Sequence, residues 1–223
     1  MSSEIMPIQS ELISWDLPLS GHLLIFSDKK LLFNQAIVLL MEMRKGDIQT
    51  APSRKANREI FRTYYSLGKA ANLITEFLKE KGYKAEACPA LGGEVNYPLL
   101  AEEAGLGKIG KHGLLITPEF GPSLRIAAVY TELTNLPVSD RNPHLWVGDF
   151  CRNCMLCVKS CPAGAIYSDP KIFKDQTEQH IDYQKCAVPF SNNHACTICI
   201  RDCIFFKTDY SRIKKSFLKT NPA

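Results

Sequence analysis

The chain has 223 residues, of which 45% are apolar and 22% charged, and its formal net charge is +4. This composition excludes a disordered chain, a collagen-like repeat and a coiled coil, and the charge is too small to indicate nucleic acid by itself. The unusual feature is the nine cysteines, eight of which lie between Cys151 and Cys203.

The sequence shows no membrane-spanning segment and no secretory signal. The longest apolar run, residues 36–41, is far shorter than the roughly 20 residues that a spanning helix needs. The first ten residues, MSSEIMPIQS, lack a basic region followed by a long apolar stretch. We therefore expect a cytoplasmic protein without membrane contact, in which cysteines serve metal or redox chemistry and not disulfide bonds.

The first third of the chain predicts two strands and one long helix. Residues 22–26 could form a short strand, and the apolar residues 36–43 predict a buried one. Pro52 and Ser53 then open a helix that ends at Gly82. Its apolar residues recur at steps of three and four, at Ile60, Phe61, Tyr64, Leu67, Ala71, Ile74 and Leu78.

The middle of the chain predicts further strands around a short helix. Residues 83–88 alternate as in a strand, and Pro98 begins a helix that Gly105 closes. Residues 114–117 and 124–130 flank the turn PEFGP and predict a hairpin. Together these elements indicate an α/β fold.

The composition shifts to Cys, Pro, Asn and Asp from residue 140 on. We therefore predict three parts: an α/β domain over 1–145, a small ferredoxin-like domain over 146–210, and a basic tail over 211–223. Because residues 140–210 show little apolar periodicity, metal–thiolate bonds are expected to replace a core there.

The cysteines follow the pattern of a ferredoxin with two [4Fe-4S] clusters, C-x2-C-x2-C-x3-C-P, in which the fourth cysteine binds the other cluster. This crossed assignment gives the first cluster Cys151, Cys154, Cys157 and Cys203, and the second cluster Cys161, Cys186, Cys196 and Cys199. Structural zinc, the alternative, uses paired C-x2-C motifs and does not explain three cysteines followed by x3-C-P. One departure is that Ile204, and not proline, follows Cys203. Cys88 is left over and is predicted to be a buried small residue.

Gly105, Gly107 and Gly110 match the dinucleotide-binding pattern G-x-G-x-x-G, but in the wrong context. That motif follows a strand and opens a helix, whereas here a helix precedes it and a strand follows. We interpret the segment as a loop kept free of side chains so that a large flat ligand can approach. A tight helix-to-strand turn is the competing interpretation.

Two segments resemble the superfamily of epoxyqueuosine reductases and reductive dehalogenases. They are YPLLAEEAGLGKIGKHGLLITPEFGPSLRIAAVYTELTNLP and FCRNCMLCVKSCPAGAI. The resemblance covers residues 36–205, and AGLGKIGKHGLLI is its most specific part outside the cysteines. It implies a nitroreductase-like domain, in two or three layers, that binds cobalamin, and a ferredoxin domain that feeds it electrons.

The resemblance also implies a mechanism and a set of cofactor-binding residues. In this superfamily the clusters reduce the corrin to cobalt(I), which acts on the substrate while a nearby acid supplies a proton. The cobalamin is base-off with no histidine ligand, and no D-x-H-x-x-G signature occurs in this chain. The residues expected to line the corrin are Gly105, Leu106, Gly107, Gly110, Lys111, His112, Gly113 and Leu114. A loop histidine bonded to the backbone is the alternative for His112.

The chain departs from the family where the proton donor is expected. Epoxyqueuosine reductases carry a catalytic aspartate before the AGLG segment, and Leu91 lies nearest to that position here. Glu94 and Tyr97 are the proton donors close by, and reductive dehalogenases use a tyrosine; an aromatic that packs before Pro98 is the alternative for Tyr97.

The chain also lacks the C-terminal helical repeats of long epoxyqueuosine reductases, so tRNA binding is doubtful, and the basic SRIKKSFLK is expected to be a solvated face.

Two functions follow as hypotheses. In the first, an external low-potential donor passes electrons through two [4Fe-4S] clusters to a cobalamin, which reduces a small molecule or a modified nucleoside. In the second, the chain is a non-catalytic iron–sulfur electron carrier without cobalamin.

Overall fold

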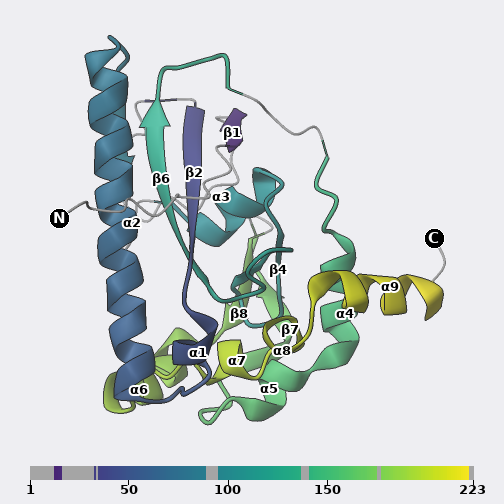
Figure 1. Cartoon of the computed structure of the whole chain (residues 1–223). Coiled ribbons are helices and arrows are strands. Elements are labelled where there is room, and N and C mark those ends of the chain that lie inside the picture. Colours follow the sequence, from purple (N-terminus) through teal and green to yellow (C-terminus); the bar gives the residue numbers. More distant parts are fainter. Residues whose placement is uncertain are drawn as a thin grey trace.

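The computed structural model describes residues 13–16, 33, 35–88, 95–136, 141–174 and 177–220, which form a mixed α/β structure (Figure 1). The strands are β1 (Ile13–Asp16), β2 (Gln35–Glu42), β3 (Ala85–Cys88), β4 (Lys108–Ile109), β5 (Leu115–Ile116), β6 (Leu124–Thr131), β7 (Ile166–Ile172) and β8 (Glu178–Ile181). The helices are α1 (Lys45–Ile48), α2 (Arg54–Glu80), α3 (Tyr97–Glu103), α4 (Trp146–Cys154), α5 (Leu156–Ser160), α6 (Tyr183–Asn192), α7 (Ile198–Arg201), α8 (Ile204–Lys207) and α9 (Tyr210–Thr220). The strand predicted over residues 22–26 lies outside the described residues.

An antiparallel sheet in the order β1-β2-β6-β3 organises the first half of the chain. Side chains of β2 alternate between its faces, as the pleat of a strand requires. Ile37 and Leu39 pack with Leu67 of α2 on one face, while Val38 packs with Leu100 of α3 on the other. The sheet is therefore covered on both faces, as a three-layer arrangement, and the predicted buried strand is confirmed as β2.

Helix α2 confirms the long helix predicted from periodicity. Ser53 precedes it and its side chain accepts a hydrogen bond from the Ala56 backbone amide, 3.1 Å away, which satisfies one free N–H of the first turn. Gly82 follows the helix with a φ of +87°, the left-handed conformation that glycine adopts readily. The outer face of α2 stays exposed and carries apolar residues, namely Phe61, Tyr65, Leu73 and Phe77.

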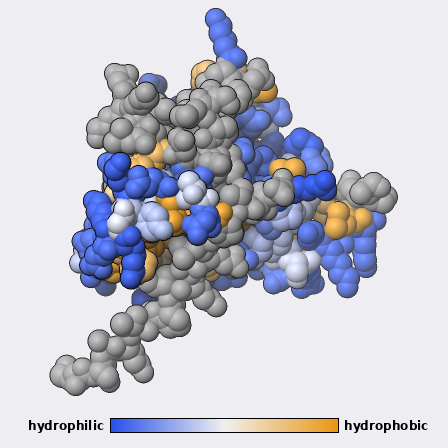
Figure 2. Space-filling view, turned by 90° about the horizontal axis from the view of Figure 1, so that it is seen from above, coloured by the Kyte–Doolittle hydropathy of each residue, from blue (hydrophilic) through white to orange (hydrophobic). Residues whose placement is uncertain are grey.

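Figure 2 shows one face of the molecule, coloured by hydropathy. From above, hydrophilic residues cover most of the coloured surface and apolar residues form small separate patches (Figure 2). No helix in the described part of the chain combines the length and the hydropathy needed to cross a bilayer.

The hairpin predicted around the turn PEFGP is wrong. β5 pairs with β4, and β6 pairs with β2 and β3, so the two predicted partners belong to different sheets. Only the bridge between Thr117 and Gly121 connects the two sides of the turn. The physical reason is burial, since β6 is covered on both faces and takes the centre of the large sheet, where it gains two strand partners.

The sequence predicts no core in the cysteine-rich part, but the structure has one, and both halves of the chain contribute to it. We call it the shared core, and its buried members are Met43, Ile48, Ala51, Ala56, Ile60, Ile116, Val147, Ala195, Ile200, Cys203, Phe205, Phe206, Tyr210 and Ile213. It joins α1 and the start of α2 to α7, α8 and α9. Residues 211–220, predicted as part of a basic tail, lie in α9, which buries Ile213 in this core. The domain boundaries at 145 and 210 stay a prediction.

Candidate functional site

The first four cysteines of the predicted cluster motif lie on two short consecutive helices. Cys151 and Cys154 lie on α4, Cys157 on α5, and Cys161 directly follows α5. Met155 separates the two helices with a φ of +56°, a left-handed conformation that is uncommon for a residue with a Cβ. This sharp turn lets cysteines on both helices face the same region.

The other four cysteines lie on or beside helices α6, α7 and α8. Cys186 lies on α6, Cys199 on α7, and Cys203 directly before α8. Cys196 follows His194 and Ala195, which both have positive φ, at 49° and 59°. All nine cysteines are free thiols in the described structure.

The charges that act on each cysteine divide these eight into two groups. Burial raises the pKa of Cys203, and the nearby thiolates of Cys151, Cys157 and Cys154 raise it further. Burial likewise raises the pKa of Cys186, together with the charges of Cys161 and Cys196. A thiol must lose its proton to bind iron, and the positive charge of the iron ions would offset the repulsion between the resulting thiolates.

Cys199 belongs to the second group. Burial raises its pKa to about 12, with contributions from Cys186, Cys157, Cys196 and Cys161. Cys157, which the crossed spacing places in the first group, also acts on Cys199, and the two ligand sets stay a prediction. In the described residues, no three His, Cys, Asp or Glu side chains meet where one metal ion would bind. A four-iron cluster takes its thiolates on different irons, so its ligands need not converge on one point.

The glycine-rich loop, residues 105–114, lies directly against the first group of cysteines. The backbone amide of Lys111 donates a hydrogen bond to the Cys151 thiol, which opposes the effect of burial; the pKa of Cys151 is nevertheless raised to about 11. The Lys111 ammonium donates to the backbone carbonyl of Ser168 in β7. A Cβ added at Gly113 would lie 3.2 Å from the Cβ of His180 in β8, so this end of the loop packs closely on the cysteine-rich half.

Polar contacts fix the shape of this loop. The Glu102 carboxylate accepts from the Ile109 backbone amide at 2.6 Å and from the Lys108 ammonium at 2.5 Å. The side-chain amide of Asn142 donates to the backbone carbonyls of Glu102 and Gly107, at 2.9 and 2.8 Å. The loop is therefore held from both α3 and the segment that leads into α4.

Two of the loop glycines pack closely against Ile116. A Cβ at Gly107 would lie 2.3 Å from the backbone oxygen of Ile116, and one at Gly110 would lie 2.6 Å from the Ile116 side chain. Both distances are shorter than side chains tolerate, so the packing of β4 on β5 already requires glycine there. Packing on Ile116 thus accounts for glycine at these two positions independently of a corrin ring.

We expect Gly107→Ala to destabilise the fold, because the added methyl group would overlap a backbone oxygen that cannot move independently. The free energy of unfolding should fall by about 1–3 kcal/mol, the usual cost of overpacking. Gly68→Ala is the matched control, since nothing lies within 4 Å of a Cβ at Gly68 in α2. That variant should gain up to about 1 kcal/mol from helix propensity. Denaturation of both variants in parallel measures the difference, and equal stabilities would contradict this account of Gly107.

His112 provides a separate indication of a ligand at the loop. Its ring is buried, and its Nδ1 accepts a hydrogen bond from the Leu114 backbone amide at 3.2 Å. Burial lowers the pKa of His112 to about 4, with a smaller contribution from His180, so the ring is neutral and carries its proton on Nε2. This Nε2–H has no hydrogen-bond partner among the described residues. A buried donor without an acceptor costs free energy of folding, and an acceptor on a group bound beside His112 would remove this cost.

Of the two residues predicted as proton donors, Tyr97 lies within the described residues. Tyr97 begins α3 and packs in the core between α3 and the sheet, with 9% of its surface exposed. This is the place expected for an aromatic that packs before Pro98, and the role of Tyr97 as an acid stays a prediction. Glu94 and Leu91 lie outside the described residues. Cys88 is buried in the same core as Tyr97, in agreement with its predicted packing role.

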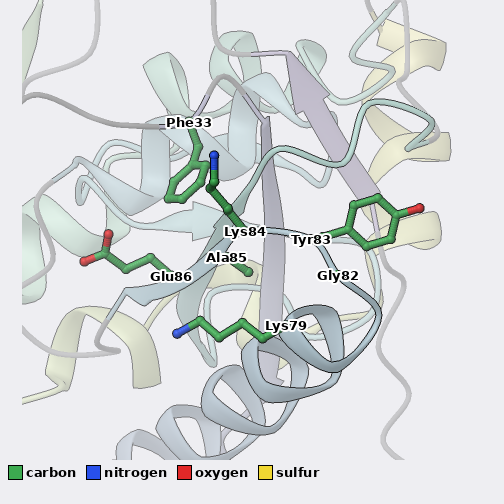
Figure 3. Close-up of a pocket in the computed structure, with 7 residues that line it drawn as sticks. All are labelled: Phe33, Lys79, Gly82, Tyr83, Lys84, Ala85 and Glu86. Carbon is green, nitrogen blue, oxygen red and sulfur yellow. The ribbon is translucent and has the colours of Figure 1, made fainter.

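A hollow of about 480 Å³ lies elsewhere, where the end of α2 meets β3 (Figure 3). It is lined by Phe33, Lys79, Gly82, Tyr83, Lys84, Ala85 and Glu86. None of these residues is a cysteine or belongs to the loop 105–114. The charged side chains do not converge on a common point in Figure 3. The hollow is therefore separate from the candidate site.

Sequence reasoning missed one charged residue at the site, Arg125 in β6. Its surroundings come from a tertiary contact, because its guanidinium lies over the ring of Tyr64, with 4.9 Å between the guanidinium carbon and the ring centre. The available signal was that Arg125 is the single charged residue within the apolar strand LRIAAVYT.

Comparisons with known proteins agree with the cysteine pattern. The family described as "4Fe-4S binding domain" matches residues 145–167, which include Cys151, Cys154, Cys157 and Cys161. This part of the chain is ferredoxin-like, and the protein is an iron–sulfur protein that binds [4Fe-4S] clusters.

Similarity to characterised enzymes extends over most of the chain. A tetrachloroethene reductive dehalogenase of Desulfitobacterium hafniense is 35% identical over 186 residues, which cover 78% of this chain and 33% of the relative. An epoxyqueuosine reductase of Listeria monocytogenes is 33% identical over 114 residues, covering 48% of this chain and 28% of the relative. The chain thus spans about a third of the length of these relatives.

A solved structure shows that the fold is shared. The catabolic reductive dehalogenase NpRdhA superposes with a TM-score of 0.76 at 21% identity, over 95% of this chain and 32% of that protein. One structure in this group is described as suggesting a mechanism for B12-dependent dehalogenation. The chain is thus similar in sequence to the superfamily of reductive dehalogenases and epoxyqueuosine reductases, and it shares the fold of a reductive dehalogenase.

Proposed function

We propose that this chain is a reductase in which an external low-potential donor reduces two [4Fe-4S] clusters, and in which the loop 105–114 binds a cobalamin next to the first cluster. The observation that carries the proposal is the contact of this loop with Cys151, through the backbone amide of Lys111. A cofactor held on the loop would lie close to a cluster ligand, as rapid electron transfer requires. When bound, cobalamin supplies the low-valent cobalt that reduces the substrate.

Each cluster has four cysteines in this proposal. The first has Cys151, Cys154, Cys157 and Cys203, and the second has Cys161, Cys186, Cys196 and Cys199. The grouping of thiolate charges supports both sets. The antiparallel sheet between α2 and α3 is, in the same proposal, a nitroreductase-like domain.

The residues of the loop have separate roles in this proposal. His112 offers its unpartnered Nε2–H to the bound group. Lys111 joins the loop to β7 and to Cys151, and Gly105 and Gly113, with φ of +75° and +73°, turn the backbone on either side. Leu106 and Leu114 supply apolar contact. The substrate class is a small organic molecule, by similarity to enzymes that act on tetrachloroethene.

A second candidate function is an iron–sulfur electron carrier without cobalamin. The observation that favours it is the packing of Gly107 and Gly110 on Ile116, which explains two of the loop glycines without any ligand.

Titration of the anaerobic, cluster-loaded protein with hydroxocobalamin distinguishes the two functions. We expect a spectral change to the base-off form and a calorimetric binding signal. His112→Phe keeps an aromatic ring but removes the donor, so binding should weaken about fivefold, the effect of losing one hydrogen bond of about 1 kcal/mol. The clusters, followed by their visible absorbance, should be unchanged. Absence of both signals in the wild-type protein would establish the electron-carrier function instead.

A further inference from the structure

Arg125 is a half-buried cation on the central strand β6, and its Nε atom is fully buried. It lies on β6 opposite Met41 of β2, and its guanidinium stacks on the Tyr64 ring of α2. Its Nε is buried and has no hydrogen-bond partner among the described residues. None of the ion pairs in the described part of the chain joins Arg125 to a carboxylate.

A buried cation without a carboxylate partner needs another source of negative charge. The face of the Tyr64 ring provides part of it. The other source is Cys199, whose charge acts on Arg125 and which packs, like Tyr64, against the shared core. Burial lowers the pKa of Arg125, while Tyr64 and the Cys199 thiolate act in the opposite direction. An arginine stays charged under these conditions.

We propose that Arg125 raises the reduction potential of the cluster held by Cys161, Cys186, Cys196 and Cys199. Reduction adds one electron to a site that four thiolates already make anionic, and a cation enclosed in a medium of low dielectric constant stabilises the added charge. This inference rests on the proposed ligand set of the second cluster and does not depend on cobalamin. Arg125 is a positioning residue, since it acts on the cluster through its charge and not as a ligand.

The consequence concerns the order in which the two clusters take up electrons. Arg125 favours reduction of the second cluster, while the loop 105–114 contacts a ligand of the first. The second cluster would then hold an electron ready for transfer to the first cluster, beside the loop.

A redox titration monitored by electron paramagnetic resonance tests this proposal, with titanium(III) citrate as the reductant. In Arg125→Gln we expect the reduced-to-oxidised ratio of the second cluster to fall at least tenfold at a given solution potential. That change equals about 59 mV for a one-electron couple. The signal of the second cluster is identified as the one missing from Cys161→Ser.

Matched variants separate charge from packing. Arg125→Lys keeps the positive charge and should retain most of the wild-type potential, whereas Arg58→Gln removes an exposed charge of α2 and should leave both potentials unchanged. If Arg125→Gln does not retain its clusters, Arg125→Met gives the same measurement with an apolar side chain suited to the buried site. Iron and sulfide analysis verifies that each variant is loaded.

Two results would overturn the inference. One is an unchanged potential of the second cluster in a loaded neutral variant, and the other is an equal shift in Arg125→Gln and Arg125→Lys. Failure of the proposed ligand set is a different result, since Cys161→Ser and Cys151→Ser would then lose the same [4Fe-4S] signal.

Discussion

Cys161→Ser should remove one of the two clusters and leave the other in place. Iron and acid-labile sulfide should each fall from about eight to about four per chain. The reason is that Cys161 follows the first three cysteines in the sequence but acts electrostatically on Cys186, in the second group. Its sulfur already accepts a hydrogen bond from the Ala165 backbone amide at 3.3 Å, which fixes its position. Electron paramagnetic resonance of the reduced protein should show one remaining signal.

Cys88→Ala is the matched control for this experiment. Cys88 is buried in the core between the sheet and α3, away from both groups, so the variant should retain both clusters. The crossed assignment would be contradicted if Cys161→Ser lost the signal that Cys151→Ser also loses. Far-ultraviolet circular dichroism verifies that the serine variants remain folded.

Trp146→Ala should lower the free energy of unfolding by about 3 kcal/mol, at the lower end of values for a buried aromatic because Trp146 is only partly buried. Its ring lies between 5.1 and 6.4 Å, centre to centre, from the rings of Tyr210, Phe217, Phe205 and Phe150. These aromatics hold α4, α8 and α9 together on the shared core. For a chain of this size the midpoint of thermal unfolding should fall by about 6–12 °C.

The measurement is anaerobic thermal unfolding at a fixed scan rate, followed by circular dichroism and by cluster absorbance together. Since the shared core joins both halves of the chain, both signals should shift to lower temperature in one step. Phe173→Ala is the control: Phe173 is 51% exposed, and its loss should change stability by no more than about 0.5 kcal/mol. A Trp146 variant as stable as this control would contradict the role of the aromatic cluster.

Local patterns were sufficient to predict the longest elements and the cysteine set. The stripe of apolar residues, the Ser53 cap and Gly82 define α2 because helix periodicity and capping involve only neighbouring residues. The continuous apolar run predicts β2 for the same reason. Likewise, the spacing of the cysteines predicts [4Fe-4S] chemistry, because successive ligands of one cluster come from adjacent turns.

Patterns along the chain could not show which segments pair or pack together. The predicted hairpin paired two segments because they are adjacent in sequence. The prediction was wrong, since β6 lies inside the large sheet, where it pairs with two strands, β2 and β3. The close approach of Gly121 to the Phe205 backbone oxygen, 2.3 Å from an added Cβ, likewise joins residues far apart in sequence.

The sequence by itself thus determined the main helix, the central strand and the residue types of an iron–sulfur centre. Tertiary structure alone decided that the two halves share a core, whose members come one or two at a time from short helices and leave no periodic signal. It also decided that the Lys111 amide acts on Cys151 and that the Arg125 guanidinium stacks on the Tyr64 ring. Electrostatic and packing interactions depend on distance in space, and residues separated by dozens of positions become neighbours only when the chain folds.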